Sequence, residues 1–424
     1  MKVLVVGAGA REHALVSALM ADPEVDAVIA APGNPGMATI TLCEPVDPLD
    51  AAAVTALAAR HTVDLVVIGP EAPLVAGVAD AVRDAGIACY GPSAPAARLE
   101  GSKAFAKEVM AAADVPTGMA HLCTTLTEVE DALDAFGAPH VVKDDGLAAG
   151  KGVVVTDDRA AALTHAQACL AKTGGQVVVE EFLDGPEVSL FVVCDGEHVV
   201  PLTPAQDFKR VGDGDTGPNT GGMGAYSPLP WAPEHLVEDL VARVAQPVVT
   251  EMARRGTPFV GTLFIGLALT SRGPRVIEFN ARFGDPETQV VLARLLSPLG
   301  QLLYAAATGA LDRHPPLRWR DEAAVTVVVA AEGYPGTPRS GDPVEGLADV
   351  AEVPTAYVLH AGTAAGPDGT VVASGGRVLS VVALGEDLAQ ARERVYAAVD
   401  RVSLAGSHHR GDIALKAVRG EIAV

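Results

Sequence analysis

The strongest candidate for chemistry in this sequence is the stretch VIEFNARFGDPE. Period-two alternation along a strand predicts Glu278 and Asn280 on one face and Ile277 and Phe279 on the other. A carboxylate beside an amide offers hard oxygen ligands, which suit a Mg²⁺ ion that carries phosphate groups and keeps several waters. If the strand continues, Arg282 joins the same face and can stabilise phosphoryl charge. A plain ion-pair cluster is the simpler alternative, although unpaired charge beside apolar neighbours is costly.

Glycines surround a lysine in the segment DDGLAAGKG, residues 144–152. A Walker A loop needs four residues between its first glycine and the Gly-Lys pair, and then Ser or Thr. Here there are three, and Gly152 follows Lys151, with strands rather than a helix expected on both sides. The segment is therefore not a P-loop. A glycine hairpin between strands can still lie over phosphates, and an ordinary flexible hairpin remains the alternative.

Two further segments place polar groups where a ligand could use them. In VVVEEFLDGPE, residues 177–187, an apolar strand leads into two carboxylates, and such a linker could offer backbone groups to adenine and a carboxylate to ribose. A solvated strand end is the plainer interpretation.

The loop RVGDGDTGPNTGGMG, residues 210–224, carries two acids and six glycines. Loops of this length inside a domain are commonly lids or binding loops.

No nucleophile–base pair stands out, and the histidines lack the spacing of metal ligands. The candidate residues therefore favour phosphoryl transfer, in which a protein acts by positioning and electrostatics.

The N-terminus, MKVLVVGAGAREHAL, looks like the first turn of a dinucleotide-binding fold but departs from it. The fingerprint G-x-G-x-x-G requires a third glycine where Glu12 stands and an acid at the end of the second strand, where Ala31 stands. An NAD-dependent oxidoreductase is therefore disfavoured. Gly7 and Gly9 still predict a tight turn, the amides that begin the next helix suit a phosphate, and Arg11 adds a cation.

The elements that must position these residues fall into an α/β part followed by α+β parts. Residues 1–101 alternate apolar strands with helices, which predicts a parallel sheet covered on both faces. Ligands bind at the carboxyl ends of such strands, where the loops 7–11, 32–36 and 69–73 converge. The pattern then changes to an α+β module, and a polar break at 318–322 precedes a small last unit.

Bulk properties narrow the functional classes. A length of 424 residues predicts roughly three domains. The net charge of −22 argues against nucleic-acid partners and anionic membrane surfaces, while a few placed Arg and Lys suffice for a small anion. The five scattered cysteines indicate a reduced, cytoplasmic protein. No apolar run approaches the ~18 residues that span a bilayer.

Together these residues resemble the phosphoribosylamine–glycine ligase family of the ATP-grasp superfamily, over nearly the full chain. The resemblance rests on GAGAREHAL, APGNPG, GPEAPLVAGV, LEGSKAF, DGLAAGKGVVV, EEFLDGPEVS, DTGPNTGGMGAYSP, IEFNARFGDPETQ, LHAGT and GGRVLSV. It implies a Rossmann-like N-terminal domain (1–101), an ATP-grasp domain (102–321) with a mobile lid at about 115–190, and a C-terminal α+β domain (322–424). It implies ATP-dependent joining of glycine to 5-phosphoribosylamine through a glycyl phosphate, in purine synthesis. We expect a monomer without nucleic-acid or membrane partners.

The resemblance also implies roles for individual residues. The resemblance implies that ATP is bound by Lys103 and Lys143 at its phosphates, by the phosphate lid with Gly146, Gly150, Lys151 and Gly152, by the adenine linker Glu180, Glu181, Phe182 and Leu183, and by Glu187 at the ribose. Binding of Mg²⁺ or Mn²⁺ falls to Glu278 and Asn280. Arg282 and Asp285, with the loop 213–220 that contains Asp213, are expected to face glycine and the reaction centre. The other substrate contacts are Gly9, Arg11, Asn34, Glu71, Asp215, Thr216 and Asn219.

Three positions depart from the family pattern. Asp144 stands where Ala is usual, and we expect it to point away from the phosphates. Phe208 stands where His is usual and receives no role. The strand at 263–267 lacks a carboxylate, which leaves most of the metal charge to Glu278. Another carboxylate–amine ligase of the same fold remains the main alternative, ahead of a non-catalytic ligand binder.

Overall fold

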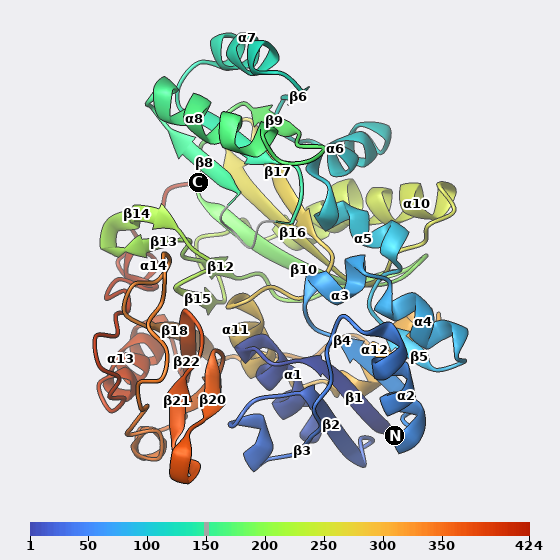
Figure 1. Ribbon diagram of the computed structural model, residues 1–424, viewed down its shortest axis with the longest axis vertical. Coiled ribbons are helices and arrows are strands. Elements are labelled where there is room, and N and C mark those ends of the chain that lie inside the picture. The colour runs from blue at the N-terminus through green and yellow to red at the C-terminus, as the bar shows by residue number, and fades with distance from the viewer. Residues whose placement is uncertain (148–151) are drawn as a thin grey trace.

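The N-terminal part is a parallel sheet with helices on both sides. The structure is a computed structural model and describes residues 1–147 and 152–424 (Figure 1). Five parallel strands run in the order β3-β2-β1-β4-β5, with β1 at the centre. Its elements are β1 Lys2–Gly7, α1 Ala10–Met20, β2 Ala27–Pro32, β3 Leu42–Cys43, α2 Ala51–His61, β4 Leu65–Ile68, α3 Glu71–Val75, α4 Val78–Asp84, β5 Ala88–Tyr90 and α5 Ala94–Gly101. The continuous apolar run of β1 is buried because both faces of the sheet are covered.

A separate four-stranded antiparallel sheet, in the order β6-β9-β7-β8, stands above the rest of the molecule in Figure 1. Helices α7 and α8 pack on each other and on this sheet, around a small core of their own that includes Val129, Leu133 and Val179. Its elements are β6 Ala120–Cys123, α7 Leu126–Phe136, β7 His140–Asp144, β8 Val153–Thr156, α8 Arg159–Leu170 and β9 Val177–Glu180. This unit lies inside the predicted lid segment, 115–190.

The central sheet is antiparallel, in the order β11-β10-β16-β17. A β-bulge interrupts the pairing of β16 with β17, because Gly266 pairs with Glu278 but Leu267 pairs with Val276. Its elements are α6 Lys103–Ala112, β10 Glu187–Asp195, β11 Val199–Pro201, α9 Leu236–Leu240, a π-helical stretch Val241–Ala245, α10 Gln246–Arg254, β16 Val260–Thr270, β17 Gly273–Asn280, α11 Glu287–Arg294 and α12 Leu299–Ala307.

The third large sheet crosses the predicted boundary at 321/322. Its order is β12-β15-β18-β22-β19, so two short strands from the middle of the chain extend the C-terminal sheet. Its elements and their neighbours are β12 Gln206–Asp207, β13 Arg210–Gly212, β14 Thr216–Asn219, β15 Gly224–Ser227, β18 Ala323–Ala330, β19 Tyr357–His360, β20 Thr363–Ala365, β21 Val371–Ala373, β22 Arg377–Gly385, α13 Leu388–Val399 and α14 Leu415–Val418. The loop 210–224, in which β13 pairs with β14, therefore connects two strands of this shared sheet, β12 and β15.

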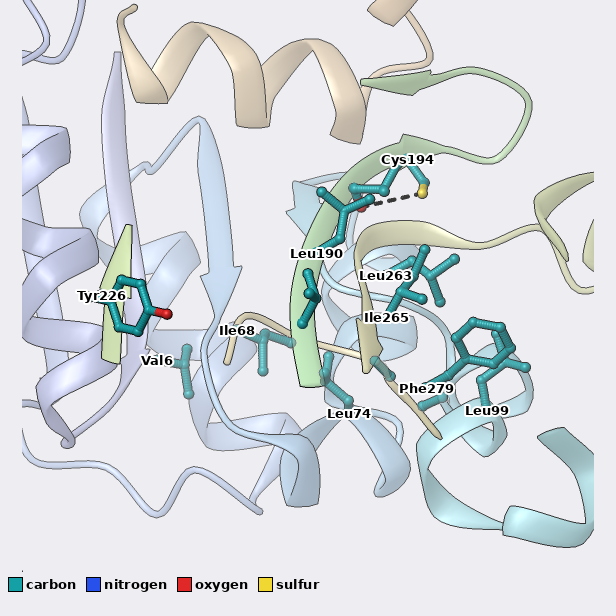
Figure 2. Close-up of a cluster of buried hydrophobic side chains, with 14 of the residues drawn as sticks. Val6, Ile68, Leu74, Leu99, Leu190, Cys194, Tyr226, Leu263, Ile265 and Phe279 are labelled. Atoms are coloured by element: carbon teal, nitrogen blue, oxygen red, sulfur yellow. Dashed lines mark hydrogen bonds between the residues drawn. The ribbon is translucent and has the colours of Figure 1, made fainter. Parts of the chain in front are cut away.

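The domains share apolar packing. Figure 2 shows one cluster that includes Val6 and Ile68 of the N-terminal sheet, Leu190 and Ile265 of the central sheet, and Tyr226 of the third sheet at its edge. Burial of this kind stabilises by about 25 cal/mol per Å² of apolar surface, so the cluster holds the sheets together. No helix among the described residues is long and apolar enough to cross a membrane.

Candidate active site

A cleft of about 940 Å³ lies where the N-terminal, lid, central and C-terminal elements meet. Most predicted site residues line it. These are Arg11, Glu71, Lys103, Lys143, Gly146, Gly152, Glu180, Glu181, Phe182, Leu183, Glu187, Asp215, Asn219, Glu278, Asn280, Arg282 and Asp285. Segments far apart in sequence therefore converge on one cavity.

Strand β17 carries the predicted metal ligands into the cleft. Glu278 and Asn280 line it together, and Phe279 turns into the core, as alternation predicts. Ile277 lines it as well, contrary to the alternation, at the bulge where one extra residue of β17 is accommodated. Burial raises the pKa of Glu278, but nearby lysines, Lys209 foremost, hold it below its ordinary value. The group is therefore a carboxylate at neutral pH.

The donor set around Asn280 fits a divalent cation. When the Asn280 amide is oriented so that its nitrogen donates to Glu100 Oε1 (3.2 Å) and to the Phe279 carbonyl (3.3 Å), its oxygen is left for another partner. Together with Glu278 this gives two hard oxygen donors. Mg²⁺ typically takes one or two protein ligands and completes its shell with phosphates and water. No group of three metal-ligating side chains occurs in the described part of the chain, so Glu278 and Asn280 suit a nucleotide-borne ion.

Arg282 follows β17 and is held between two acids. Its Nε contacts Glu71 Oε2 (3.3 Å) and its Nη2 contacts Glu100 Oε1 (2.9 Å). Glu100 also accepts a hydrogen bond from the Ala281 amide (2.8 Å), so it fixes the end of the strand. Burial raises the pKa of Glu100, and the Arg282 guanidinium opposes that rise. Glu100 lies at the end of α5 in the motif LEGSKAF, but no role was predicted for it.

The two predicted phosphate lysines enter from different elements. Lys103, at the start of α6, donates to the Gly146 carbonyl (2.9 Å), and burial lowers its pKa. Lys143, on β7, contacts Glu180 Oε2 (3.0 Å) and donates to the Ile277 carbonyl (3.1 Å). The same Glu180 oxygen lies 3.4 Å from Lys107 Nζ. The Glu180 carboxylate is therefore occupied by lysines, and it orients them rather than facing a nucleobase directly.

The predicted adenine linker continues along the cleft wall. Glu181, Phe182 and Leu183 all line the cleft, and the Phe182 side chain is 46% exposed, so its ring is open to a ligand. Glu181 also accepts from Arg272 (3.2 Å), which anchors the linker.

Glu187, the predicted ribose ligand, forms an ion pair with Lys209. Lys209 Nζ also lies 3.8 Å from Asp207 Oδ1. Burial raises the pKa of Asp207 to about 7, and Lys209 opposes that rise. Lys209 and Asp207 both line the cleft. Neither was predicted as a site residue, because neither lies in a recognised motif.

The glycine-rich segment is described only in part. Gly146 and Gly152 line the cleft, while Gly150 and Lys151 lie outside the described residues. Asp144 is buried and forms an ion pair with Lys172, and it does not line the cleft. The added negative charge is thus neutralised by Lys172 outside the cleft.

The structure divides the loop residues between the cleft and the C-terminal domain. Asp215 and Asn219 line the cleft, but Asp213 and Thr216 do not. Asp213 Oδ1 accepts from the Gly411 amide (2.8 Å), and the Thr216 hydroxyl donates to the Asp213 carbonyl (2.9 Å). The placement of Asp213 at the reaction centre is therefore corrected, because its carboxylate fastens the loop to another segment.

The N-terminal turn is built around Glu12, in the place of the missing glycine. Glu12 Oε2 accepts from the Gly9 amide (2.7 Å), and Glu12 Oε1 accepts from Arg11 Nε (2.5 Å). The Gly9 amide that was expected to meet a phosphate is therefore already bonded, and Gly9 does not line the cleft. Arg11 does line it, and its Nη1 donates to the Phe283 carbonyl (3.2 Å).

Asn34, the remaining predicted substrate contact, holds loops together instead of lining the cleft. It is buried, and its Nδ2 donates to the carbonyls of Ala8 (2.8 Å) and His360 (2.9 Å). Since both amide hydrogens are used, we correct its placement to a structural contact between the first and last domains.

Asp285 meets a cation that the sequence did not single out. Arg377, at the start of β22, donates to Asp285 Oδ2 (3.1 Å) and to the carbonyls of Asp285 (2.8 Å) and Gly221 (2.6 Å). Burial raises the pKa of Asp285, but Arg377 and Arg11 lower it below its ordinary value. The C-terminal domain therefore contributes charge to the cleft. The motif GGRVLSV contains Arg377 and was the available signal.

A nucleotide-sized cleft between a two-sheet grasp and a Rossmann-like domain, with two lysines and a Glu–Asn pair, defines an ATP-grasp enzyme. Family models of phosphoribosylglycinamide synthetase match the N domain over residues 1–100, the ATP-grasp (A) domain over 101–288 and the C domain over 324–416. The chain belongs to this phosphoribosylglycinamide synthetase family, and the predicted family and fold class are confirmed.

Relatives and solved structures agree with this assignment. The chain is 68% identical to a phosphoribosylamine–glycine ligase of Streptomyces coelicolor, over 98% of this chain and 99% of the relative. It is 58% identical to the Mycobacterium tuberculosis protein of that name, over the full length of both. The crystal structure of the Thermotoga maritima ligase superposes with a TM-score of 0.83 at 30% identity, covering 98% and 100% of the chains. A biotin carboxylase domain from Hydrogenobacter thermophilus (TM-score 0.73, 18% identity) shares the fold.

Proposed function

We propose that this protein joins glycine to 5-phosphoribosylamine at the expense of ATP, giving glycinamide ribonucleotide, ADP and phosphate in purine synthesis. Family membership supports the reaction. The observation that carries it within the structure is the convergence of Lys103 and Lys143, of Glu278 and Asn280, and of Arg282 on one cleft. These groups can hold a polyphosphate and balance charge on a phosphoryl group in flight.

The chemistry that we propose proceeds in two displacements. The glycine carboxylate attacks the γ-phosphorus of ATP, ADP leaves, and a glycyl phosphate forms. The amine of phosphoribosylamine then attacks the activated carbonyl, phosphate leaves, and an amide forms. Water would hydrolyse the acyl phosphate, so elements that surround the cleft serve to exclude it.

Charge in the cleft supports these roles. Lys103 and Lys143 are the groups that we expect on the ATP phosphates, and Arg282 is placed to stabilise the transferred phosphoryl group. A divalent ion, Mg²⁺ or Mn²⁺, held by Glu278 and Asn280 would neutralise phosphate oxygens. Arg377 next to Asp285 suits the end of the cleft where anionic substrates meet.

The phosphate of phosphoribosylamine is assigned to the N-terminal side of the cleft. Arg11 and Glu71 line that side, and Arg11 is the cation that stands beside the helix start. We further propose a cytoplasmic monomer, for which the free cysteines and the net charge of −22 are the support.

The test is a measurement of ADP release by the purified protein with ATP, Mg²⁺ and freshly generated phosphoribosylamine, with glycine compared against alanine, serine and no amino acid. We expect ADP release that depends on both glycine and the amine, with glycinamide ribonucleotide formed in equal amount. Release with another amino acid but not with glycine would reassign the chain to a different carboxylate–amine ligase.

A further inference from the structure

The cleft loop 213–219 is fastened from outside the cleft by one buried arginine of the C-terminal domain. Arg410 is 1% exposed. Its Nη1 contacts Asp215 Oδ1 (2.9 Å) and donates to the Arg210 carbonyl (3.1 Å). Its Nε and Nη2 each donate to Asp412 at 2.7 Å, which is the bidentate geometry of an arginine–carboxylate pair. One guanidinium thus joins both sides of the loop to the C-terminal segment.

The contact is reciprocal. Asp412 Oδ2 accepts from the Gly214 amide (2.8 Å), and Asp213 Oδ1 accepts from the Gly411 amide (2.8 Å). Lys416 Nζ reaches the second oxygen of Asp215 (3.2 Å). Residues some 200 positions apart in sequence therefore form a closed network of hydrogen bonds.

The network holds a residue in an unfavourable conformation. Asp215 has a φ of 57°, in the left-handed region that non-glycine residues rarely adopt. Aspartate adopts this region more readily than most non-glycine residues, but it still needs support from its surroundings. Both carboxylate oxygens of Asp215 contact cations of the C-terminal domain, which supplies that constraint.

The same network reaches the cleft surface. Asp215 and Asn219 line the cleft, and Asn219 Nδ2 lies 3.5 Å from the Val153 carbonyl of the lid strand β8. The Arg410 guanidinium also lies over the ring of Phe208, 4.8 Å from its centre, and Phe208 lines the cleft too. Movement of Arg410 would therefore shift two separate stretches of the cleft wall.

We propose that Arg410 is a positioning residue that holds the loop 213–219 against the cleft in the geometry that receives glycine. The naming of glycine rests on the proposed function. The guanidinium acts through Asp215, Arg210 and Phe208 and does not itself line the cleft. Lysine cannot replace it, because one ammonium cannot hold Asp412 in bidentate fashion while also bonding Asp215 and a carbonyl.

The experiment compares full-length R410K with the control R401K, whose arginine forms a half-exposed pair with Glu352 (3.2 Å). The control makes the same arginine-to-lysine exchange in the same domain, and neither substitution alters the net charge. We expect R410K to raise the KM for glycine at least fivefold, to leave the KM for ATP within twofold, and to speed amide hydrogen exchange in 212–220. We expect R401K to match the wild type in all three.

A purely structural role would give a different result. It would lower the melting temperature and raise exchange evenly across β18 and β22, with normal KM values in the folded enzyme. That result, or unchanged exchange in the loop, would overturn the proposal. If R410K does not fold, D412N is tested in its place, because it removes half of the bidentate pair. The KM for glycine, the KM for ATP and the loop exchange then decide for or against the proposal. Loop exchange needs no substrate, so it separates a failure of this proposal from a failure of the proposed function.

Discussion

At the scale of single residues, Glu278 is the group whose charge the site most needs. The E278Q substitution keeps size and one oxygen but removes the negative charge that would face a divalent ion. We expect the Mg²⁺ concentration for half-maximal activity to rise at least by the roughly 10- to 100-fold that loss of a supporting group costs a metal site. The measurement is ADP release over a Mg²⁺ titration, with E197Q, at an exposed turn, as control. Normal turnover at ordinary Mg²⁺ would refute the metal assignment.

Sequence could predict the residues whose chemistry is visible in one short motif. Glu278 and Asn280 are such a case, because strand alternation places them on one face, and Arg282, which follows the end of β17 in the same motif, reaches the same cleft. The site roles of Glu100 and Lys209 could not be predicted this way. Glu100 pairs with Arg282, which is distant in sequence, and Lys209 acts through the acids that the fold brings around it. Asp213 shows the opposite error, a residue that was predicted in the site and lies outside the cleft. The sequence of a glycine-rich loop does not determine which donor a carboxylate will meet, and here the donor is the Gly411 amide.

At the scale of elements, the N-terminal turn depends on glycines that make room for Glu12. A Cβ at Gly69 would lie 2.1 Å from Glu12 Oε1 and 2.5 Å from its Cγ. The G69A substitution must therefore displace Glu12 from the Gly9 amide and from Arg11. We expect the free energy of unfolding to fall by about 1–3 kcal/mol, because of overpacking and an unsatisfied buried amide. We also expect the KM for phosphoribosylamine to rise, with little change in the KM for ATP.

The control for this prediction is G101A, at the end of α5. A Cβ there meets only Val75 Cγ2 at 3.4 Å, and alanine suits a helix better than glycine does. Thermal unfolding and steady-state kinetics of both variants give the comparison. Equal melting temperatures for G69A and G101A would contradict the packing argument. The fingerprint itself predicted the turn correctly, but only the structure shows that a carboxylate replaces the third glycine by bonding the turn from inside.

Most elements were predictable because their apolar residues are periodic or continuous. The parallel N-terminal sheet and the strands β10, β16 and β18 follow runs that can only be buried. Helix α11 was not predicted, because Thr288, Gln289 and their apolar neighbours are buried on several sides and show no clear amphipathic stripe. Helix α12 was not predicted either, although Leu299, Leu302, Leu303 and Ala306 form a buried stripe at helical spacing. The shared third sheet could not be predicted from the sequence either, because the pairing of β15 with β18 joins strands about 100 residues apart.

At the scale of the whole molecule, two buried histidines join the first domain to the last. The His360 amide donates to His13 Nδ1 (2.9 Å), the rings lie 5.9 Å apart, and Gly36 packs against both. Burial lowers the pKa of His13 to about 4, with His360 as a further cause, and burial lowers that of His360 to about 4. Both histidines are therefore neutral in the folded enzyme at neutral pH, where Nδ1 of His13 can accept the amide.

This junction predicts a loss of stability in mild acid. The folded pKa values lie below the ordinary value of 6.5, so the unfolded chain binds protons first as the pH falls. Stability should be unaffected by these groups above pH 6.5, should fall between pH 6.5 and 4, by at most about 3 kcal/mol for each histidine, and should level off below. The H13N substitution keeps a hydrogen-bond acceptor but removes the titrating imidazole. Its melting temperature should therefore drop less between pH 7.5 and pH 5 than that of the wild type. The control H235Q, at an exposed position, should behave as the wild type does. Equal drops in all three would show that the acid sensitivity arises outside the His13–His360 junction.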